Sequence, residues 1–272
     1  TFSIPIGKLD RSEVDLVIRR IQKEFPITVN WTRLHTNKLR VGHLIGNRFT
    51  VTITEIDVPS KVALERAERI ASLLRVNGLP NYFGPQRFGI DGSNVRRGYD
   101  IVLGNLKVGD RWLRRFLVNS YQSYLCNMYL ALRVRRGLFH RVIAGDFARK
   151  YTTRSWFEVV DEEKEQRRYE AHEISFTAPV YGFRMPFPRG LAGELELEVL
   201  ADFGLKLENF EPVKAFGSRR IGRIIPKDLV VKKSPDGLTL SFILPRGGFA
   251  TTVLREFMKT DSTPESYREL PI

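Results

Sequence analysis

The feature that most constrains the fold is a long helical pattern in the middle of the chain, at residues 110–136. Strand patterns lie on both sides of it. Apolar residues alternate with threonines at 49–54, and later strands are predicted at 221–225, 229–233 and 238–244. Because strands from the start and end of a chain can pair in one sheet, this order predicts an α+β fold in which one domain is interrupted by an insertion.

Helical spacing of apolar residues predicts further elements. Ser12 and Ser60 are expected to cap helices that Pro26 and Gly78 end, and another helix is expected after the glycine pair at 247–248. A strand is predicted at 27–34 and further helices at 161–174 and 191–203. The expected buried residues of the central and last helices are Trp112, Phe116, Leu117, Tyr124, Met128 and Leu132, with Val253, Leu254, Phe257 and Met258.

Length and composition place the chain among globular proteins of one large domain or two ordinary ones. It has 272 residues, of which 42% are hydrophobic, so it can bury a core. No apolar run reaches membrane-spanning length and no signal-peptide pattern opens the chain. The single cysteine, Cys126, cannot form an internal disulfide and is expected in the core, which suggests a reducing compartment and therefore the cytoplasm.

Charge is both large and unevenly distributed. The net charge is +13, and residues 26–54 contain no acidic residue. A second basic cluster comprises Arg219, Arg220, Arg223, Lys227, Lys232 and Lys233, whereas acidic residues gather at 161–165 and 194–198. Segregation of this kind favours a basic face for a polyanion, nucleic acid first and an anionic membrane second. The chain lacks the basic amphipathic helix that a membrane-surface protein needs.

Several catalytic chemistries are excluded by what the sequence lacks. Four scattered histidines and one cysteine do not make a zinc site. There is no P-loop, no nucleophile-elbow motif and no H-E-x-x-H motif. We therefore expect no metal site, nucleotide-binding site or serine-hydrolase chemistry.

A loop rich in aromatic residues follows Gly78, in the stretch "GLPNYFGPQRFGIDGSN". Aromatic rings can stack on unpaired bases, while Gln86 can bond a base edge and Arg87 a phosphate. The alternative is that Tyr82 and Phe83 form a small apolar core that braces a tight turn. Both interpretations can hold together.

Two more stretches suit RNA. In "NKLRVGHLIGNRF", basic residues alternate with Gly42 and Gly46, which would let the backbone approach a bulky ligand. The alternative is a plain basic hairpin. In "PRGGFATTVLREFM", Phe249 stands at a helix start, where backbone amides attract phosphate. Here the alternative is that Phe249 packs into the core.

Together these stretches resemble the TruD family of pseudouridine synthases. "GNRF", "NYFGPQRFG" and "GGFATTVLRE" carry the resemblance, which is weakest from about residue 100 to 215. It implies a mixed or antiparallel sheet flanked by helices. The catalytic domain would comprise residues 1–97 and 216–272, and a mostly helical α+β insertion domain residues 98–215.

The resemblance also implies an activity, the isomerisation of uridine to pseudouridine in tRNA, at position 13 in bacterial members. The uridine is flipped out, an aspartate attacks it, and the base rotates to form a carbon–carbon glycosidic bond. No cofactor, protein partner or membrane is implied. By motif, Asn47 and Phe49 shape the active site and Phe249 stacks on the base. The expected RNA-binding residues are Arg33, Lys38, Arg40, Arg48, Gln86, Arg87, Arg219 and Arg220.

The sequence departs from the family pattern at the nucleophile. In the family, a "G-x-K-D-[KR]" motif precedes a strand similar to "TFSIP", which here is residues 1–5. The nucleophilic aspartate is therefore expected upstream of Thr1. Asp10 lies on the wrong side of that strand and next to a helix cap, and Asp91 and Asp146 resemble turn residues. The alternative function is a non-catalytic RNA-binding protein or RNA chaperone on the same fold.

Overall fold

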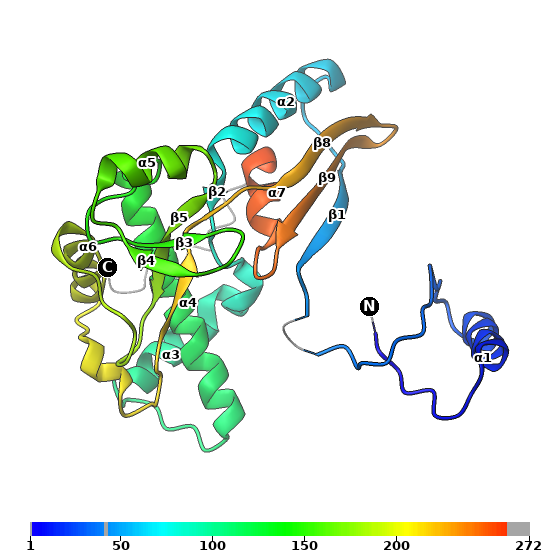
Figure 1. Ribbon diagram of the computed structural model, residues 1–272, viewed down its shortest axis with the longest axis horizontal. Helices are drawn as coiled ribbons and strands as arrows, with labels where there is room; N and C mark the ends of the chain where they lie inside the picture. Colours follow the sequence, from blue (N-terminus) through cyan, green and yellow to red (C-terminus); the bar gives the residue numbers. More distant parts are fainter. Residues whose placement is uncertain (1, 41–42, 260–272) are drawn as a thin grey trace. The chain divides into compact units, whose positions relative to one another are not determined.

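The computed structural model describes residues 2–40 and 43–259, and the chain divides into two compact units, Thr1–Ile45 and Gly46–Ile272. The smaller unit holds one helix, α1 (Arg11–Glu24) (Figure 1). Asp10, not Ser12, caps it. The Asp10 carboxylate accepts a hydrogen bond from the Glu13 amide at 2.9 Å, and the Glu13 carboxylate accepts one from the Asp10 amide at 2.8 Å.

The strand predicted at residues 27–34 is wrong. These residues form no strand in the described part of the smaller unit, and Ile27 and Trp31 are exposed. β-Branched residues favour extended backbone, but a strand needs a partner to satisfy its peptide groups.

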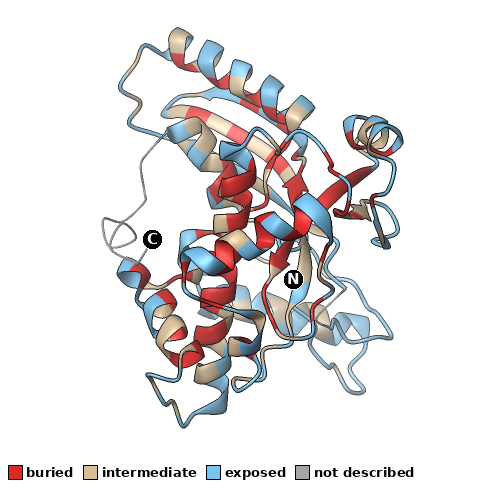
Figure 2. Ribbon diagram, turned by 90° about the vertical axis from the view of Figure 1, so that its left-hand side faces the viewer, coloured by how far each residue is buried: buried red, intermediate tan, exposed pale blue. Residues whose placement is uncertain are grey.

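The larger unit begins with a three-stranded antiparallel sheet. Its order is β1 (Gly46–Ile53), β9 (Gly237–Pro245) and β8 (Lys227–Ser234), which confirms that an early strand pairs with a late one. Helix α2 (Ser60–Asn77) buries alanines and Leu74 in the core that this sheet forms with α7 (Ala250–Met258) (Figures 1 and 2).

A second core surrounds the long central helix α4 (Arg111–Arg135), which confirms the central prediction. Helices α3 (Ser93–Val102) and α6 (Gly190–Asp202) pack against α4. So does β5 (Ile174–Val180), which belongs to a four-stranded antiparallel sheet. The other three strands of that sheet are β3 (Phe147–Lys150), β4 (Trp156–Glu158) and β6 (Ser218–Ile221).

The central core confirms one burial prediction and contradicts another. Cys126 is fully buried, and burial raises the pKa of its thiol to about 12. Trp112 is 72% exposed and stacks on Phe116 in the first turns of α4. Helical spacing identifies the apolar face of a helix, but it does not say where along the helix the core ends.

Several element boundaries differ from the predictions. The charged helix α5 (Glu162–Glu170) is shorter than expected, because Ile174 already starts β5. Met258 is the last residue of α7 and is 48% exposed. The other elements are the pair β2 (Leu79–Pro80) and β7 (Arg223–Ile224), and the short helices η1 (Pro85–Arg87), η2 (Ile90–Gly92) and η3 (Leu207–Phe210).

The strand predicted at 221–225 is broken at Gly222. A β-carbon there would lie 2.2 Å from the Phe176 ring, so the backbone passes close to that ring and β6 and β7 form separate pairings. β6 pairs with β5, so this sheet joins strands on either side of residue 216. The expected domain boundaries at 97 and 216 stay predictions.

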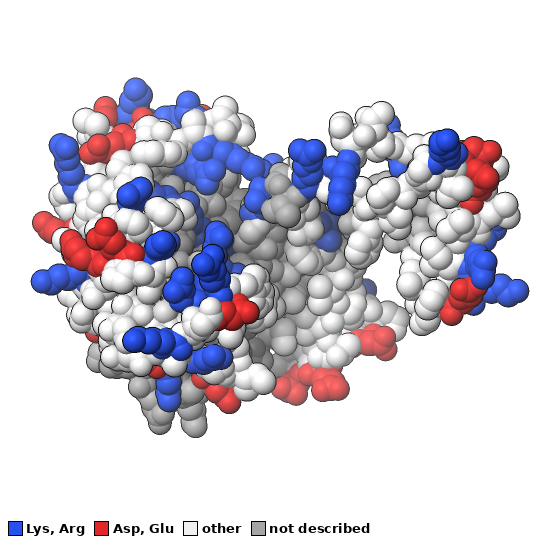
Figure 3. All heavy atoms as spheres, turned by 90° about the horizontal axis from the view of Figure 1, so that it is seen from below, with Lys and Arg blue, Asp and Glu red and all other residues white. Residues whose placement is uncertain are grey.

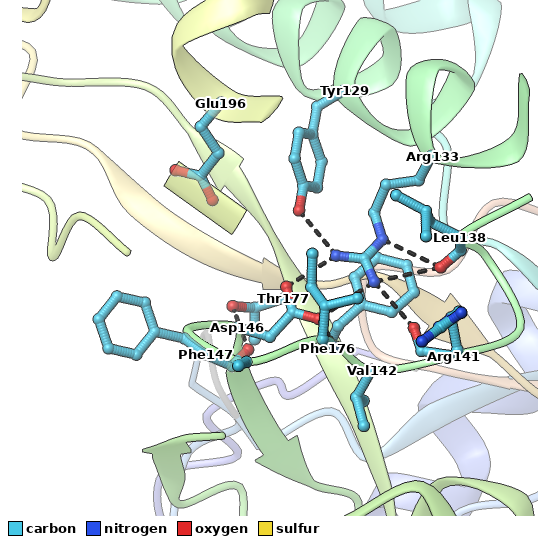
Figure 4. Close-up of polar contacts among 12 residues, drawn as sticks. Tyr129, Arg133, Leu138, Arg141, Val142, Asp146, Phe147, Phe176, Thr177 and Glu196 are labelled. Atoms are coloured by element: carbon cyan, nitrogen blue, oxygen red, sulfur yellow. Dashed lines mark hydrogen bonds and ion pairs between the residues drawn. The ribbon is translucent and has the colours of Figure 1, made fainter. Parts of the chain in front are cut away.

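A buried ion pair ties α4 to the chain before β3 (Figure 4). Arg133 Nη1 donates to Asp146 Oδ1 at 2.7 Å, and its Nη2 donates to the carbonyls of Leu138 and Arg141. The guanidinium lies 3.9 Å from the centroid of the Phe176 ring. Burial opposes the charge on Arg133, but Asp146 and Tyr129 together outweigh burial and the pKa of Arg133 is raised.

Candidate active site

Two of the three motif stretches meet in the larger unit. The loop between β2 and η1 carries Phe83, whose ring lies 5.8 Å from that of Phe249, at the start of α7. Thr251 Oγ1 donates to Gln86 Oε1 at 3.4 Å. A β-carbon on Gly84 would lie 2.9 Å from the Phe249 ring, so the loop packs closely against the helix end.

Phe249 is the residue before the first turn of α7 and is half-buried. Gly247, at φ 84°, takes the left-handed conformation that the turn from β9 into the helix requires. The prediction of a glycine pair opening a helix is confirmed. The ring is therefore not fully buried in the core, and it contacts Phe83 while part of its surface stays accessible.

Arg220, on β6, connects these two stretches. Its Nε donates to the Asn81 carbonyl at 2.9 Å, and its Nη2 donates to Asn81 Oδ1 at 2.6 Å and to the Gly247 carbonyl at 2.7 Å. The guanidinium lies 4.0 Å from the Phe83 centroid and 5.8 Å from that of Phe249. It forms no ion pair with any carboxylate that the structure describes, and burial lowers the pKa of Arg220 to about 10.

Arg219, the preceding residue, has a different environment. Its side chain is 8% exposed, and Nη2 pairs with Glu196 Oε1 at 2.5 Å while Nε donates to Thr177 Oγ1 at 2.7 Å. Arg219 is therefore held by a carboxylate, whereas Arg220 is held by neutral acceptors. The sequence grouped them as one basic cluster and missed this difference.

The third motif stretch, "NKLRVGHLIGNRF", ends in β1, at the end of the first sheet where β9 leads into the turn before Phe249. Asn47 lies opposite Leu244 in β9, just before the turn that leads to Phe249. Asn47 is exposed, whereas Phe49 is half-buried with its ring 5.5 Å from that of Phe242. Arg48 pairs with Asp228 at 2.9 Å on the surface, so its charge is partly compensated.

The remaining predicted RNA-binding residues fall in two places. Arg33, Lys38 and Arg40 belong to the smaller unit and are exposed, and Gly42 lies outside the described residues. Arg87 in the larger unit is half-buried, and burial lowers the pKa of its guanidinium. Figure 3 shows several groups of Lys and Arg side chains on the visible face of the larger unit, with smaller groups of Asp and Glu beside them.

The three aspartates that the sequence offered as less favoured nucleophiles each have a structural environment. Asp10 is a helix cap whose hydrogen bonds from Ser12 and the Glu13 amide lower the pKa of its carboxyl. Asp91 has a left-handed backbone inside η2, as expected of a turn residue. Asp146 is buried against Arg133, which its turn-like sequence did not indicate.

A cavity of about 400 Å³ adjoins Phe83 and Arg220, and the sequence did not reveal it. Its walls come from the Asn81–Arg87 loop, α4, β3, β6 and the turn after β9. Arg87 and Arg220 were expected RNA ligands, and Arg246 belongs to the stretch "PRGGFATTVLREFM", but Arg149 and Asn119 carried no sequence signal. In the described ranges no helix has the length and apolar composition of a membrane span, and no three potential metal ligands gather.

Comparisons with known proteins agree on one family. The sequence model of "tRNA pseudouridine synthase D (TruD)" matches residues 1–110 and 103–257. A tRNA pseudouridine synthase D from Thermus thermophilus is 44% identical over 229 residues, which cover 84% of this chain and 62% of that protein. The protein of the same name from Anaeromyxobacter dehalogenans is 38% identical over 236 residues, 84% of this chain and 66% of the relative.

A solved structure shows the same fold. A Methanosarcina mazei protein assigned as a tRNA pseudouridine synthase D superposes with a TM-score of 0.73 at 23% identity, covering 96% of this chain and 78% of that one. This chain spans somewhat less than two thirds of the length of the two bacterial relatives. Because the family's sequence pattern extends over nearly all of the chain, the chain belongs to the TruD family of tRNA pseudouridine synthases.

Proposed function

We propose that this protein isomerises a uridine of tRNA to pseudouridine, at position 13. The observation that carries the proposal is the meeting of Phe249, Phe83 and Arg220 beside an arginine-lined cavity. Flipping a base out of its stack costs a few kcal/mol. Stacking on one aromatic ring returns about 1–3 kcal/mol, and basic side chains supply the phosphate contacts.

The chemistry needs a nucleophile and a confined base but no redox partner. The bond from C1′ of the ribose to N1 of uracil breaks, a bond from C1′ to C5 forms, N1 gains a proton and C5 loses one to solvent. The proposed nucleophile is the aspartate of the family's G-x-K-D-[KR] motif. Phe249 would hold the base while it rotates, with Asn47 and Phe49 beside it.

For RNA binding we propose the predicted arginines and lysines that have no carboxylate partner among the described residues, unlike Arg48 and Arg219. Arg87, Arg220, Arg33, Lys38 and Arg40 would contact phosphate, and Gln86 a base edge. Arg48 forms a surface ion pair with Asp228, which partly compensates its charge. Arg219 is held by Glu196, so it would act by supporting β6.

The test measures tritium release from tRNA labelled at C5 of uridine, with the full-length protein. Phe249→Ala should lower turnover about tenfold or more while the dissociation constant for tRNA changes little, because a stacking contact of about 1–3 kcal/mol is lost. The matched control is Phe257→Ala, on the same helix in the core around α2, which should lower thermal stability and spare turnover. Wild-type turnover by Phe249→Ala would contradict the role of the ring, and tRNA binding without tritium release by the wild type would contradict the activity.

A further inference from the structure

The cavity beside Phe83 contains more cations than the protein itself neutralises. Five arginines line it, and no Asp or Glu of the described residues does. Arg219 is paired with Glu196, but the other four, Arg87, Arg149, Arg220 and Arg246, form no ion pair with a carboxylate in the described ranges. Arg87 and Arg220 are partly buried, and a charge withdrawn from water without a counterion is costly, so such a cavity favours an anionic ligand.

The cavity wall is held in place by α4. Asn127 clamps Phe83, accepting from its amide at 2.8 Å and donating to its carbonyl at 3.0 Å. Ser120 Oγ donates to the Arg87 carbonyl at 2.8 Å, and Arg87 Nε donates to Ser123 Oγ at 3.3 Å. The loop is therefore positioned before any ligand arrives, which lowers the entropic cost of binding.

Asn119 supplies a neutral recognition group. It lines the cavity from α4 and is half-buried, and its side-chain amide makes no hydrogen bond with any residue that the structure describes. An amide has donors and an acceptor on one plane, which matches the edge of a nucleobase. The cavity thus offers arginines that can bind a phosphate and an amide that can bind a base edge, which are the two kinds of contact that a nucleotide needs.

Arg220 relates this cavity to the proposed site of the flipped base. It lines the cavity and lies 4.0 Å from the Phe83 centroid, and its guanidinium is also 5.8 Å from the centroid of Phe249. The cavity is therefore one side chain away from the ring that we propose stacks on the uridine. A volume of about 400 Å³ lies in the range of small-molecule sites.

We propose that this cavity binds a second nucleotide of the substrate RNA, a neighbour of the flipped uridine, with its phosphate on Arg220 and Arg246 and its base edge on Asn119. The proposal rests on the function proposed above. Its consequence is that the enzyme selects substrates by the nucleotide next to the target as well as by the target itself.

The test uses full-length protein and tRNA in which an abasic residue replaces the nucleotide immediately 5′ or 3′ of the target uridine, or one three positions away. With the wild type, one adjacent abasic substitution should weaken binding roughly tenfold, and the distant one should have little effect. With Asn119→Ala, the loss of affinity caused by that adjacent abasic residue should shrink to about twofold or less, because the contact between residue 119 and the base is already lost. Asn105→Ala, in the loop between α3 and α4, is the matched control and should keep the full penalty.

A second variant tests the phosphate contact independently of the base. Arg246 is exposed, so Arg246→Ala should not disturb folding, and it should weaken binding of intact and abasic tRNA equally and reduce the salt slope by about one. An unchanged abasic penalty in Asn119→Ala, or no adjacent penalty in the wild type, would overturn the proposal. Binding is measured separately from tritium release. If an adjacent abasic residue weakens binding but the wild type releases no tritium, the proposed activity is refuted and the second-nucleotide site is retained.

Discussion

Arg133, Arg219 and Arg220 are all largely buried, but their partners differ. Burial opposes the charge on both Arg133 and Arg219. Asp146 with Tyr129 outweighs burial for Arg133, and Glu196 with Tyr129 and Asp146 does so for Arg219, so both pKa values are raised. Arg220 has three neutral acceptors and two aromatic rings around it, and burial lowers its pKa. Both Arg219 and Arg220 line the cavity in which we propose that RNA binds, but of the two Arg220 has no carboxylate partner among the described residues.

At this scale we predict that Asp146→Asn destabilises the protein by about 3–5 kcal/mol, because it leaves the Arg133 charge buried without a partner. Urea unfolding measures the free energy. Glu163→Gln is the control, since Glu163 and its partner Arg167 are 81% and 75% exposed and such pairs contribute at most about 1 kcal/mol. Equal effects of the two substitutions would show that the buried pair has no special role.

At the scale of elements, the periodicity of apolar residues correctly predicted those helices and strands whose formation depends on the sequence of one segment alone. β1, α2 and α4 form where alternation or helical spacing of apolar residues predicted them. The strand at 27–34 and the break at Gly222 depend on other segments, a missing partner in one case and the Phe176 ring in the other. The same limit applies to the site, because motifs named Phe249 and Arg87 but not Asn119 or Arg149, whose places depend on the packing of α4 and β3.

The contact between the Phe83 loop and α7 gives the prediction at this scale. Gly84 has a φ of −74°, which any residue adopts, but a β-carbon there would lie 2.4 Å from Gln86 Oε1 and 2.6 Å from Thr251 Oγ1. Gly84→Ala should therefore displace the loop from Phe249 and lower the rate of tritium release roughly tenfold or more. Gly109→Ala meets no atom within 4 Å and should keep the wild-type rate. If both variants turn over alike, the close approach of loop and helix is not needed for activity.

At the scale of the whole molecule, the net charge of +13 predicts that the proposed binding of RNA depends strongly on salt concentration. Phosphate contacts release counterions, so the logarithm of the association constant should fall linearly with the logarithm of the salt concentration. Family membership was predictable from three motifs, because they are short and contiguous. The number of phosphate contacts was not, since it depends on which basic residues the fold pairs with carboxylates, as it does Arg219 and Arg48.

We predict that Arg87→Ala and Arg40→Ala each weaken tRNA binding and reduce the salt slope by about one. Arg87 faces the cavity without a carboxylate partner in the described part of the chain, and Arg40 is exposed in a stretch free of acidic residues. Arg167→Ala is the control, because Arg167 is paired with Glu163 on α5 and its loss should leave the slope unchanged. A titration of tRNA binding from low to physiological salt measures all three slopes. Since Arg40 lies in the smaller unit and Arg87 in the larger one, an unchanged slope for Arg40→Ala alone would confine the RNA contact to the larger unit, and unchanged slopes for both would remove these arginines from the interface.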